Sequence, residues 1–171
     1  MTSVIKVDNI QNSSGTAALS IDSSGVITQP NKPMFAAVGA ANTALASASW
    51  SKAIFNSETF DVGGYYDPTT NYRYTPLVAG KYFFTAQAYI TYNSGTGPTI
   101  VGISFWKNGS NTLQMLRVSG TTNYGMVNVS GIFDMNGSSD YVETYLYQAS
   151  ATDAVYYANA TNGIFTGYLI G

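Results

Sequence analysis

The chain of 171 residues contains no cysteine and no histidine. This absence excludes disulfides, zinc sites made from these two residues, thiol nucleophiles and every catalytic triad that needs an imidazole. Charged residues make up only 9% of the chain and the formal net charge is −2, whereas about 25% charged residues is usual for a soluble domain. A lone monomer normally carries more charge than this, so the composition favours a protein that assembles with other copies.

Long apolar runs and basic clusters are also missing. No run of about 18 apolar residues occurs, so we predict no membrane-spanning helix and no membrane insertion. The 7 Lys and Arg residues are scattered along the chain, which argues against a phosphate-binding stripe and against nucleic acid as a partner. The glycine-rich motifs that cradle phosphates or dinucleotides are absent as well, so no cofactor is predicted.

The acidic residues do not show the pairing that hydrolysis requires. Asp61 and Asp67 flank one loop, but an Asp before a proline is a common turn opener. We therefore predict no catalytic residues and no enzyme activity. A calcium ion held near a three-fold axis by Asp134, Asp140 and Asp153 is one interpretation of the other acids; solvated loop carboxylates are the simpler one.

Short β-strand patterns separated by Gly, Asn, Ser and Pro clusters dominate the chain, which is typical of a sandwich or barrel. No helical period of useful length appears, and polar residues interrupt the Ala-rich stretch 36–48, where we expect a surface loop. Asn108 and Gly109 predict a tight hairpin turn, because both residue types tolerate positive φ. The strands expected after the first thirty residues are 33–39, 52–61, 72–77, 80–92, 99–107, 112–118, 125–135, 141–149 and 164–170.

Two of these expected strands, 80–92 and 164–170, are apolar on both faces. Such a strand has to be covered on both faces, whereas a solitary two-layer sandwich leaves one face in water. We therefore predict a homotrimer whose subunits cover that face; ordinary surface aromatics are the alternative. The residues predicted for the core or the trimer interface are Tyr82, Phe83, Phe84, Tyr89, Phe165, Tyr168 and Leu169.

Residues 60–84 read FDVGGYYDPTTNYRYTPLVAGKYFF. In order and spacing this segment resembles the globular head of complement 1q, within the tumour necrosis factor superfamily. The hairpin 106–109 (WKNG) and the closing segment 163–169 (GIFTGYL) are similar to that family too. The resemblance covers about residues 33–171 and implies an all-β jelly-roll β-sandwich of about ten strands that forms a compact homotrimer. The matched positions in the first segment are Gly64, Tyr66, Asp67, Tyr74, Thr75, Pro76, Gly80, Tyr82 and Phe84.

The first thirty residues differ from the rest. Their alternating segments are too short to bury a core alone, and Pro30 and Pro33 mark a stiff hinge. We predict a β-rich stem over residues 1–30, which trimerises and anchors the protein, followed by a head over residues 33–171. The phrase IKVDNIQN, followed by GTAALSIDSSG, resembles the openings of bacteriophage fibre and appendage proteins. No collagen-like Gly-x-y repeat occurs, which argues against an animal immune role.

Together these patterns predict a structural protein of the virion surface: a trimeric bacteriophage tail fibre, head fibre or spike, or a decoration protein of capsid or tail, that contributes to host attachment. Residues 1–30 would contact other virion proteins. A bacterial extracellular binding module of the same fold is one alternative; a fibre-borne polysaccharide depolymerase is another, although the missing acid pair counts against it. Receptor binding to a host-surface glycan or protein would use flat aromatic side chains, for which packing is the alternative interpretation: Tyr92, Trp106, Tyr124, Tyr156 and Tyr157.

Overall fold

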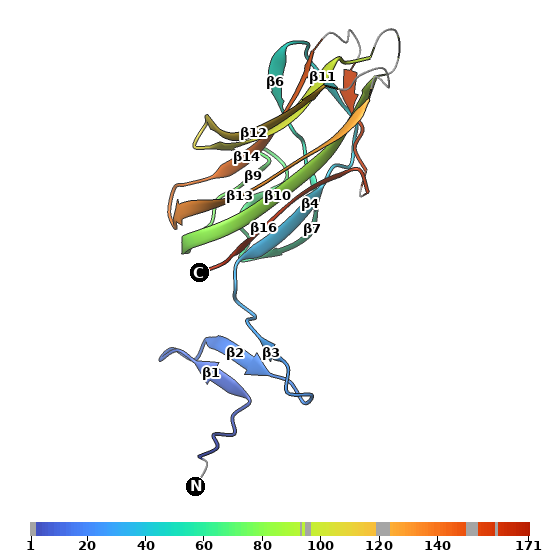
Figure 1. Cartoon of the computed structure of the whole chain (residues 1–171). Helices are drawn as coiled ribbons and strands as arrows, with labels where there is room; N and C mark the ends of the chain where they lie inside the picture. The colour runs from blue at the N-terminus through green and yellow to red at the C-terminus, as the bar shows by residue number, and fades with distance from the viewer. Residues whose placement is uncertain (1–2, 93, 95–96, 119–123, 150–153, 160) are drawn as a thin grey trace. The chain divides into compact units, whose positions relative to one another are not determined.

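The computed structural model describes residues 3–92, 94, 97–118, 124–149, 154–159 and 161–171. It divides into two compact units, an N-terminal unit (Met1–Lys32) and a head (Pro33–Gly171). Every regular element among the described residues is a β-strand (Figure 1). The described part of the chain contains no helix that is long and apolar enough to cross a membrane.

The N-terminal unit is a three-stranded antiparallel sheet of β1 (Asn9–Gln11), β2 (Ala17–Ile21) and β3 (Ile27–Thr28). Side-chain oxygens stabilise both of its turns. Between β1 and β2 the amide oxygen of Asn12 accepts the N–H of Thr16, and between β2 and β3 the carboxylate of Asp22 accepts the N–H of Val26 at 2.9 Å. Leu19 and Ile21 are half-buried, and no large apolar side chain among the unit's described residues is fully buried, so the unit lacks a core of its own. Six of its large apolar side chains are exposed: Val4, Ile5, Val7, Ile10, Val26 and Ile27.

The first sheet of the head, called here the β10 sheet, is arranged around its longest strand. One edge of β10 pairs with β13, and the other edge pairs with β16 and then β15. Beyond these lie β4 against β16, β7 against β4, and β5 against β15, all antiparallel. The strands are β4 (Met34–Val38), β5 (Thr43–Leu45), β7 (Ser57–Val62), β10 (Ala79–Tyr92), β13 (Gly125–Asn136), β15 (Ala154–Tyr156) and β16 (Gly163–Leu169).

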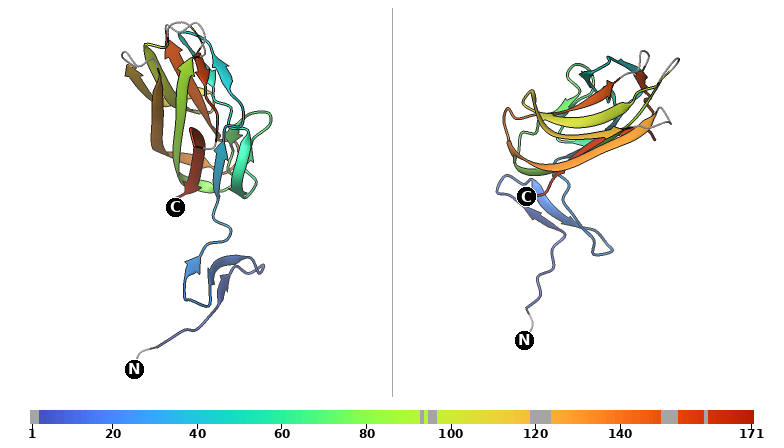
Figure 2. Two further views of the ribbon diagram at one scale, coloured as in Figure 1. Left: turned by 90° about the vertical axis from the view of Figure 1, so that its right-hand side faces the viewer. Right: turned by 45° about the horizontal axis from the view of Figure 1, so that its top comes forward.

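The second sheet, called here the β11 sheet, has the order β12-β11-β14-β9-β8. A further short strand, β6, lies beside β14, where the N–H of Ala53 donates to the carbonyl oxygen of Thr144 at 2.9 Å. The two sheets form the two layers of the head in Figures 1 and 2. The strands of this layer are β6 (Ser49–Lys52), β8 (Tyr66–Asp67), β9 (Arg73–Tyr74), β11 (Ile100–Lys107), β12 (Ser110–Val118) and β14 (Val142–Ala149).

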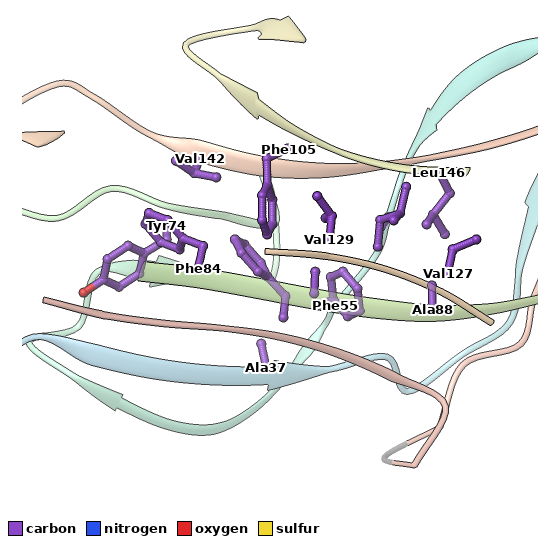
Figure 3. Close-up of a cluster of buried hydrophobic side chains, with 14 of the residues drawn as sticks. Ala37, Phe55, Tyr74, Phe84, Ala88, Phe105, Val127, Val129, Val142 and Leu146 are labelled. Carbon is purple, nitrogen blue, oxygen red and sulfur yellow. The ribbon is translucent and has the colours of Figure 1, made fainter. Parts of the chain in front are cut away.

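The hydrophobic core fills the space between the two layers, and side chains from both sheets point into it (Figure 3). The ring of Phe84 on β10 lies 6.2 Å from that of Phe105 on β11, in an edge-on contact, and 5.9 Å from that of Phe133 on β13. A Cβ at Gly167 would lie 2.4 Å from a ring carbon of Phe84. Glycine is therefore required there for the Phe84 ring to pack against β16.

The period-two patterns predict the head strands well. Val101 and Phe105 are buried, as expected from alternation, and so are Val127 and Met135. The predicted hairpin is confirmed, because Asn108 and Gly109 both have positive φ and their flanking residues pair across the turn.

Four sequence predictions in the head are wrong. The predicted strand 72–77 is reduced to the two residues of β9, Arg73 and Tyr74. Residues 52–61 are not one strand but the end of β6, beside β14, and most of β7, in the β10 sheet, and the link between them buries Phe55. The Ala-rich stretch 36–48 is a surface loop only in part: its first residues belong to β4, in agreement with the predicted strand 33–39, but β5 follows and buries Leu45. The sequence does not predict β15, because a strand of three residues is too short to show an alternating pattern.

Candidate functional site

The outward side of the β10 sheet, called here the assembly face, carries an apolar row across five neighbouring strands. The row follows the register of the sheet, in which each residue is the cross-strand partner of the next: Ile132, Phe83, Tyr168, Met34 and Val62. The rings of Phe83 and Tyr168 are 5.6 Å apart. Ile132 and Tyr168 are 62% and 46% exposed in the single chain, and the other three residues of the row are half-buried. The head therefore covers the row only in part.

A second apolar group lies towards the other end of the same face. The ring of Tyr89 is 5.8 Å from that of Tyr124 and 6.3 Å from that of Tyr157, and both partners are exposed. Met126, the cross-strand partner of Tyr89, is exposed too. Between the two apolar groups the cross-strand neighbours Ser130, Thr85 and Thr166 carry hydroxyl groups, and the next pair, Asn128 and Gln87, carries amides. The assembly face therefore has two apolar bands with a polar band between them.

The residues predicted for the core or the trimer interface divide between the assembly face and the core of the head. Phe83, Tyr89 and Tyr168 lie on the assembly face, whereas Leu169 is half-buried against the edge of the core. The remaining three are fully buried in the core of the single chain: Tyr82, Phe84 and Phe165. Alternation along a strand separates two faces, but it does not say which of them the second sheet covers.

The five aromatic residues predicted for surface recognition do not form one surface. The prediction of a surface role for Tyr156 is wrong. Tyr156 lies in β15 with 0% exposure, its ring packs 5.8 Å from that of Phe55, and burial raises the pKa of its hydroxyl. Tyr124 and Tyr157 lie on the assembly face, and Tyr92 ends β10 half-buried. Only Trp106 lies on the outward side of the other sheet, where Phe105 before it points into the core.

That outward side of the β11 sheet carries a cluster called here the aromatic platform. Trp106 stacks on Tyr145 with ring centroids 4.1 Å apart and planes 21° apart, and Trp50 packs on Tyr147 at 5.3 Å. The ion pair of Lys52 and Glu143 completes the cluster. Sequence reasoning missed most of it, although the alternation Glu143, Tyr145, Tyr147 along one strand was a signal. The platform consists of Trp50, Lys52, Trp106, Glu143, Tyr145 and Tyr147.

Electrostatic contacts tie the platform together. The ammonium group of Lys52 lies 3.0 Å from Oε1 of Glu143 and 5.7 Å from the ring centroid of Tyr145. Glu143 is only 4% exposed. Burial, together with the nearby Glu143 carboxylate, raises the pKa of Tyr145 to about 12. All four aromatic rings are half-buried, so they remain partly accessible on the sheet surface.

The acids considered for calcium have other roles where the structure describes them. Asp140 pairs with Lys107, whose ammonium lies 2.9 Å from its carboxylate, and the side chain of Asn108 is the main cause of its lowered pKa. Asp134 pairs with a lysine on β10, and Asp153 lies outside the described residues. Within the described part of the chain no group of three potential ligands could hold a metal ion, and the calcium site stays a prediction.

The acids flanking the loop before β9 hold backbone turns. The carboxylate of Asp61 accepts the N–H of Tyr66 at 2.8 Å, and that of Asp67 accepts the N–H groups of Thr69 and Thr70 at 3.0 and 2.9 Å. These contacts explain the acids as determinants of the loop conformation.

No protein-family model matches the sequence, and none of the curated proteins matches it. Solved structures do match. Murine APRIL at pH 5.0 is 10% identical, with a TM-score of 0.62, over 81% of this chain and 99% of its own. The globular domain of zebrafish complement 1qA protein is 15% identical, with a TM-score of 0.58, over 82% and 98%. Eiger TNF from S. frugiperda is 8% identical, with a TM-score of 0.60, over 82% and 94%.

The head is a jelly roll. The identities are low enough that these matches establish the architecture alone. They agree with the all-β jelly-roll sandwich that the sequence resemblance implied.

Proposed function

We propose that this protein is a trimeric, non-enzymatic binding module of a bacteriophage virion surface, in which the jelly-roll heads associate through the assembly face. In this role it is a fibre, spike or decoration protein that contributes to host attachment. The apolar row from Ile132 to Val62 is the observation that carries the proposal.

The physical argument for association rests on the exposure of that row. Monomeric soluble proteins rarely expose a contiguous apolar patch, because covering it removes about 25 cal/mol of unfavourable free energy for each Å² buried. In the single chain Ile132 is 62% exposed and Tyr168 is 46% exposed. A second copy of the same face supplies apolar surface of the same kind, and closed rotational symmetry repeats the contact without leaving an open end. Jelly-roll heads of the kind matched here fit a three-fold arrangement.

The N-terminal unit supports the anchoring part of the proposal. It exposes six large apolar side chains within 32 residues, including Ile5 and Ile27, and a sheet of this size needs further apolar cover to be stable. We assign that cover to neighbouring copies of the unit and to other virion proteins.

Molar mass in solution tests the assembly. Light scattering at micromolar concentration should give three times the 18.2 kDa of the chain. Ile132→Asp puts a charge at one end of the row, on its most exposed side chain, and should yield a folded monomer, because the side chain is exposed in the single chain. Leu77→Asp is the matched control: Leu77 is 60% exposed but lies in the loop before β10, so this variant should remain a trimer. A stable wild-type monomer contradicts the proposal.

The virion assignment needs a separate test. Antibodies against the purified head should label intact phage particles in electron micrographs, at the outer end of an appendage or over the capsid surface. Particles that lack the protein altogether would remove the virion role and leave the bacterial extracellular module in its place.

A further inference from the structure

Association through the assembly face leaves the other layer of the sandwich free. The outward sides of two stacked sheets point in opposite directions, so a contact made by the β10 sheet does not cover the outward side of the β11 sheet. The aromatic platform lies on that free side. The inference below rests on the proposed function, since it supplies the binding surface of the trimer.

Both tryptophans of the chain are on the platform. Trp50 and Trp106 come from β6 and β11, and the fold places each against a tyrosine of β14. Neither contributes to the core, which Phe and Tyr fill. Large aromatic side chains that are left half-exposed on a sheet surface provide contact area at a small cost in conformational entropy.

The platform combines flat rings with polar groups at their edges. The Glu143 carboxylate and the Lys52 ammonium lie beside the ring of Tyr145. The indole N–H of Trp106 is buried and has no hydrogen-bond partner among the described residues. Leaving such a donor unpaired costs about 1 to 3 kcal/mol, so an acceptor supplied by a ligand after a small shift of the ring is favourable.

We propose that the aromatic platform binds a saccharide built of neutral pyranose rings. One side of a pyranose carries C–H groups whose partial positive charge is attracted to the electron-rich face of an indole or phenol ring. Its hydroxyl groups, at the rim, accept hydrogen bonds, which suits the Lys52 ammonium, because the Lys52 side chain is 31% exposed. Lys52 and Glu143 offset each other's charge, and Arg73, the cross-strand partner of Glu143, stacks on Tyr141 at 4.1 Å. The paired charges favour a neutral ligand over a polyanion.

Tryptophan fluorescence measures this binding directly, because the chain has no tryptophan outside the platform. The full-length trimer is titrated with three neutral oligosaccharides of four to six sugars, derived from cellulose, mannan and dextran, and with an oligogalacturonate as the acidic arm. At least one neutral oligosaccharide should shift or quench the emission saturably, and calorimetry should give the same dissociation constant. The proposal is overturned if none of the three neutral oligosaccharides changes the emission, or if only the oligogalacturonate binds saturably.

Three variants locate the site. Trp50→Leu and Tyr147→Ser should each weaken binding about ten-fold or more, which corresponds to the loss of one stacking contact. Trp106→Phe keeps a ring on Tyr145 but removes the indole N–H, so it should weaken binding less than Trp50→Leu does. Leu77→Ala, in the loop before β10, is the control and should bind as the wild type does. Circular dichroism checks that each variant is folded, and equal affinity in all of them contradicts the placement.

Light scattering on the same samples separates this inference from the proposed function. A trimer that binds none of the saccharides leaves the assembly standing and overturns the platform as their site, whereas a monomer overturns the assembly whatever the titration shows. If the trimer attaches to host cells, periodate oxidation of cell-surface sugars should abolish attachment. Attachment that survives periodate and is lost after protease treatment assigns the platform to a protein partner instead.

Discussion

The N-terminal unit and the head are built from the same kind of strand, yet only the head buries a core. The head closes two sheets over aromatic side chains such as Phe35 and Phe84, both with 0% exposure, whereas the N-terminal unit is a single small sheet whose Ile5 is 85% exposed. The difference shows that alternation of apolar residues is not sufficient for stability. A second layer is needed, and it comes either from the same chain or from another copy.

The largest loss of stability is expected from a substitution at the centre of the core. Phe84→Ala should lower the free energy of unfolding by about 3 to 5 kcal/mol, because it leaves a cavity among packed rings. Ile10→Ala, in the N-terminal unit, should change the stability of the head by less than about 0.5 kcal/mol. Urea unfolding followed by circular dichroism compares the two. An unchanged midpoint for the Phe84 variant contradicts its core placement.

A smaller effect is expected from close packing between strands. Gly167→Ala should cost about 1 to 3 kcal/mol, because the new methyl group meets the rings of Phe84 and Phe35. Gly171→Ala is the control, since nothing lies within 4 Å of the position its Cβ would take. Equal melting temperatures of the two variants would show that β16 and the core rings are less tightly packed than the structure has them.

Asp67, in the head, should contribute to the loss of stability at acid pH. The backbone N–H groups of Thr70 and Thr69, with the side chain of Asn71, hold the pKa of Asp67 well below its ordinary value. A lowered folded-state pKa stabilises the protein above the unfolded value of about 3.9, and this contribution is lost as the pH falls further, through the folded-state pKa. Melting temperatures between pH 2 and 7 should therefore drop less steeply at the acid end for Asp67→Asn than for the wild type. Parallel curves would remove Asp67 as a cause.

The smallest effect on the head should follow from removing the N-terminal unit. Without residues 1–32 the head should keep its near-ultraviolet circular dichroism and its melting temperature, because all residues of its core come from Phe35 onwards. The same deletion should abolish incorporation into particles. Incorporation of the truncated head at the wild-type level would show that the N-terminal unit is not the anchor.

Sequence patterns predicted the longer strands because one side chain in two faces the core over eight or more residues. They failed where elements are short: β15 has three residues, and so has β5, which lies in the Ala-rich stretch where a loop was expected. The same limit applies to the sites. Trp106 was selected as a surface aromatic, but its neighbour Trp50 was not, because the two are 56 positions apart and nothing local links them.

The sequence by itself determined the all-β class, the hairpin at Asn108 and the absence of cysteine or histidine chemistry, since these depend on residue identity and on a period of two. Only the tertiary structure decided which side of each strand is covered. That choice depends on how two sheets stack, and it turned Tyr156 inward, left Tyr168 on the assembly face and brought Trp50 and Trp106 to the same free surface.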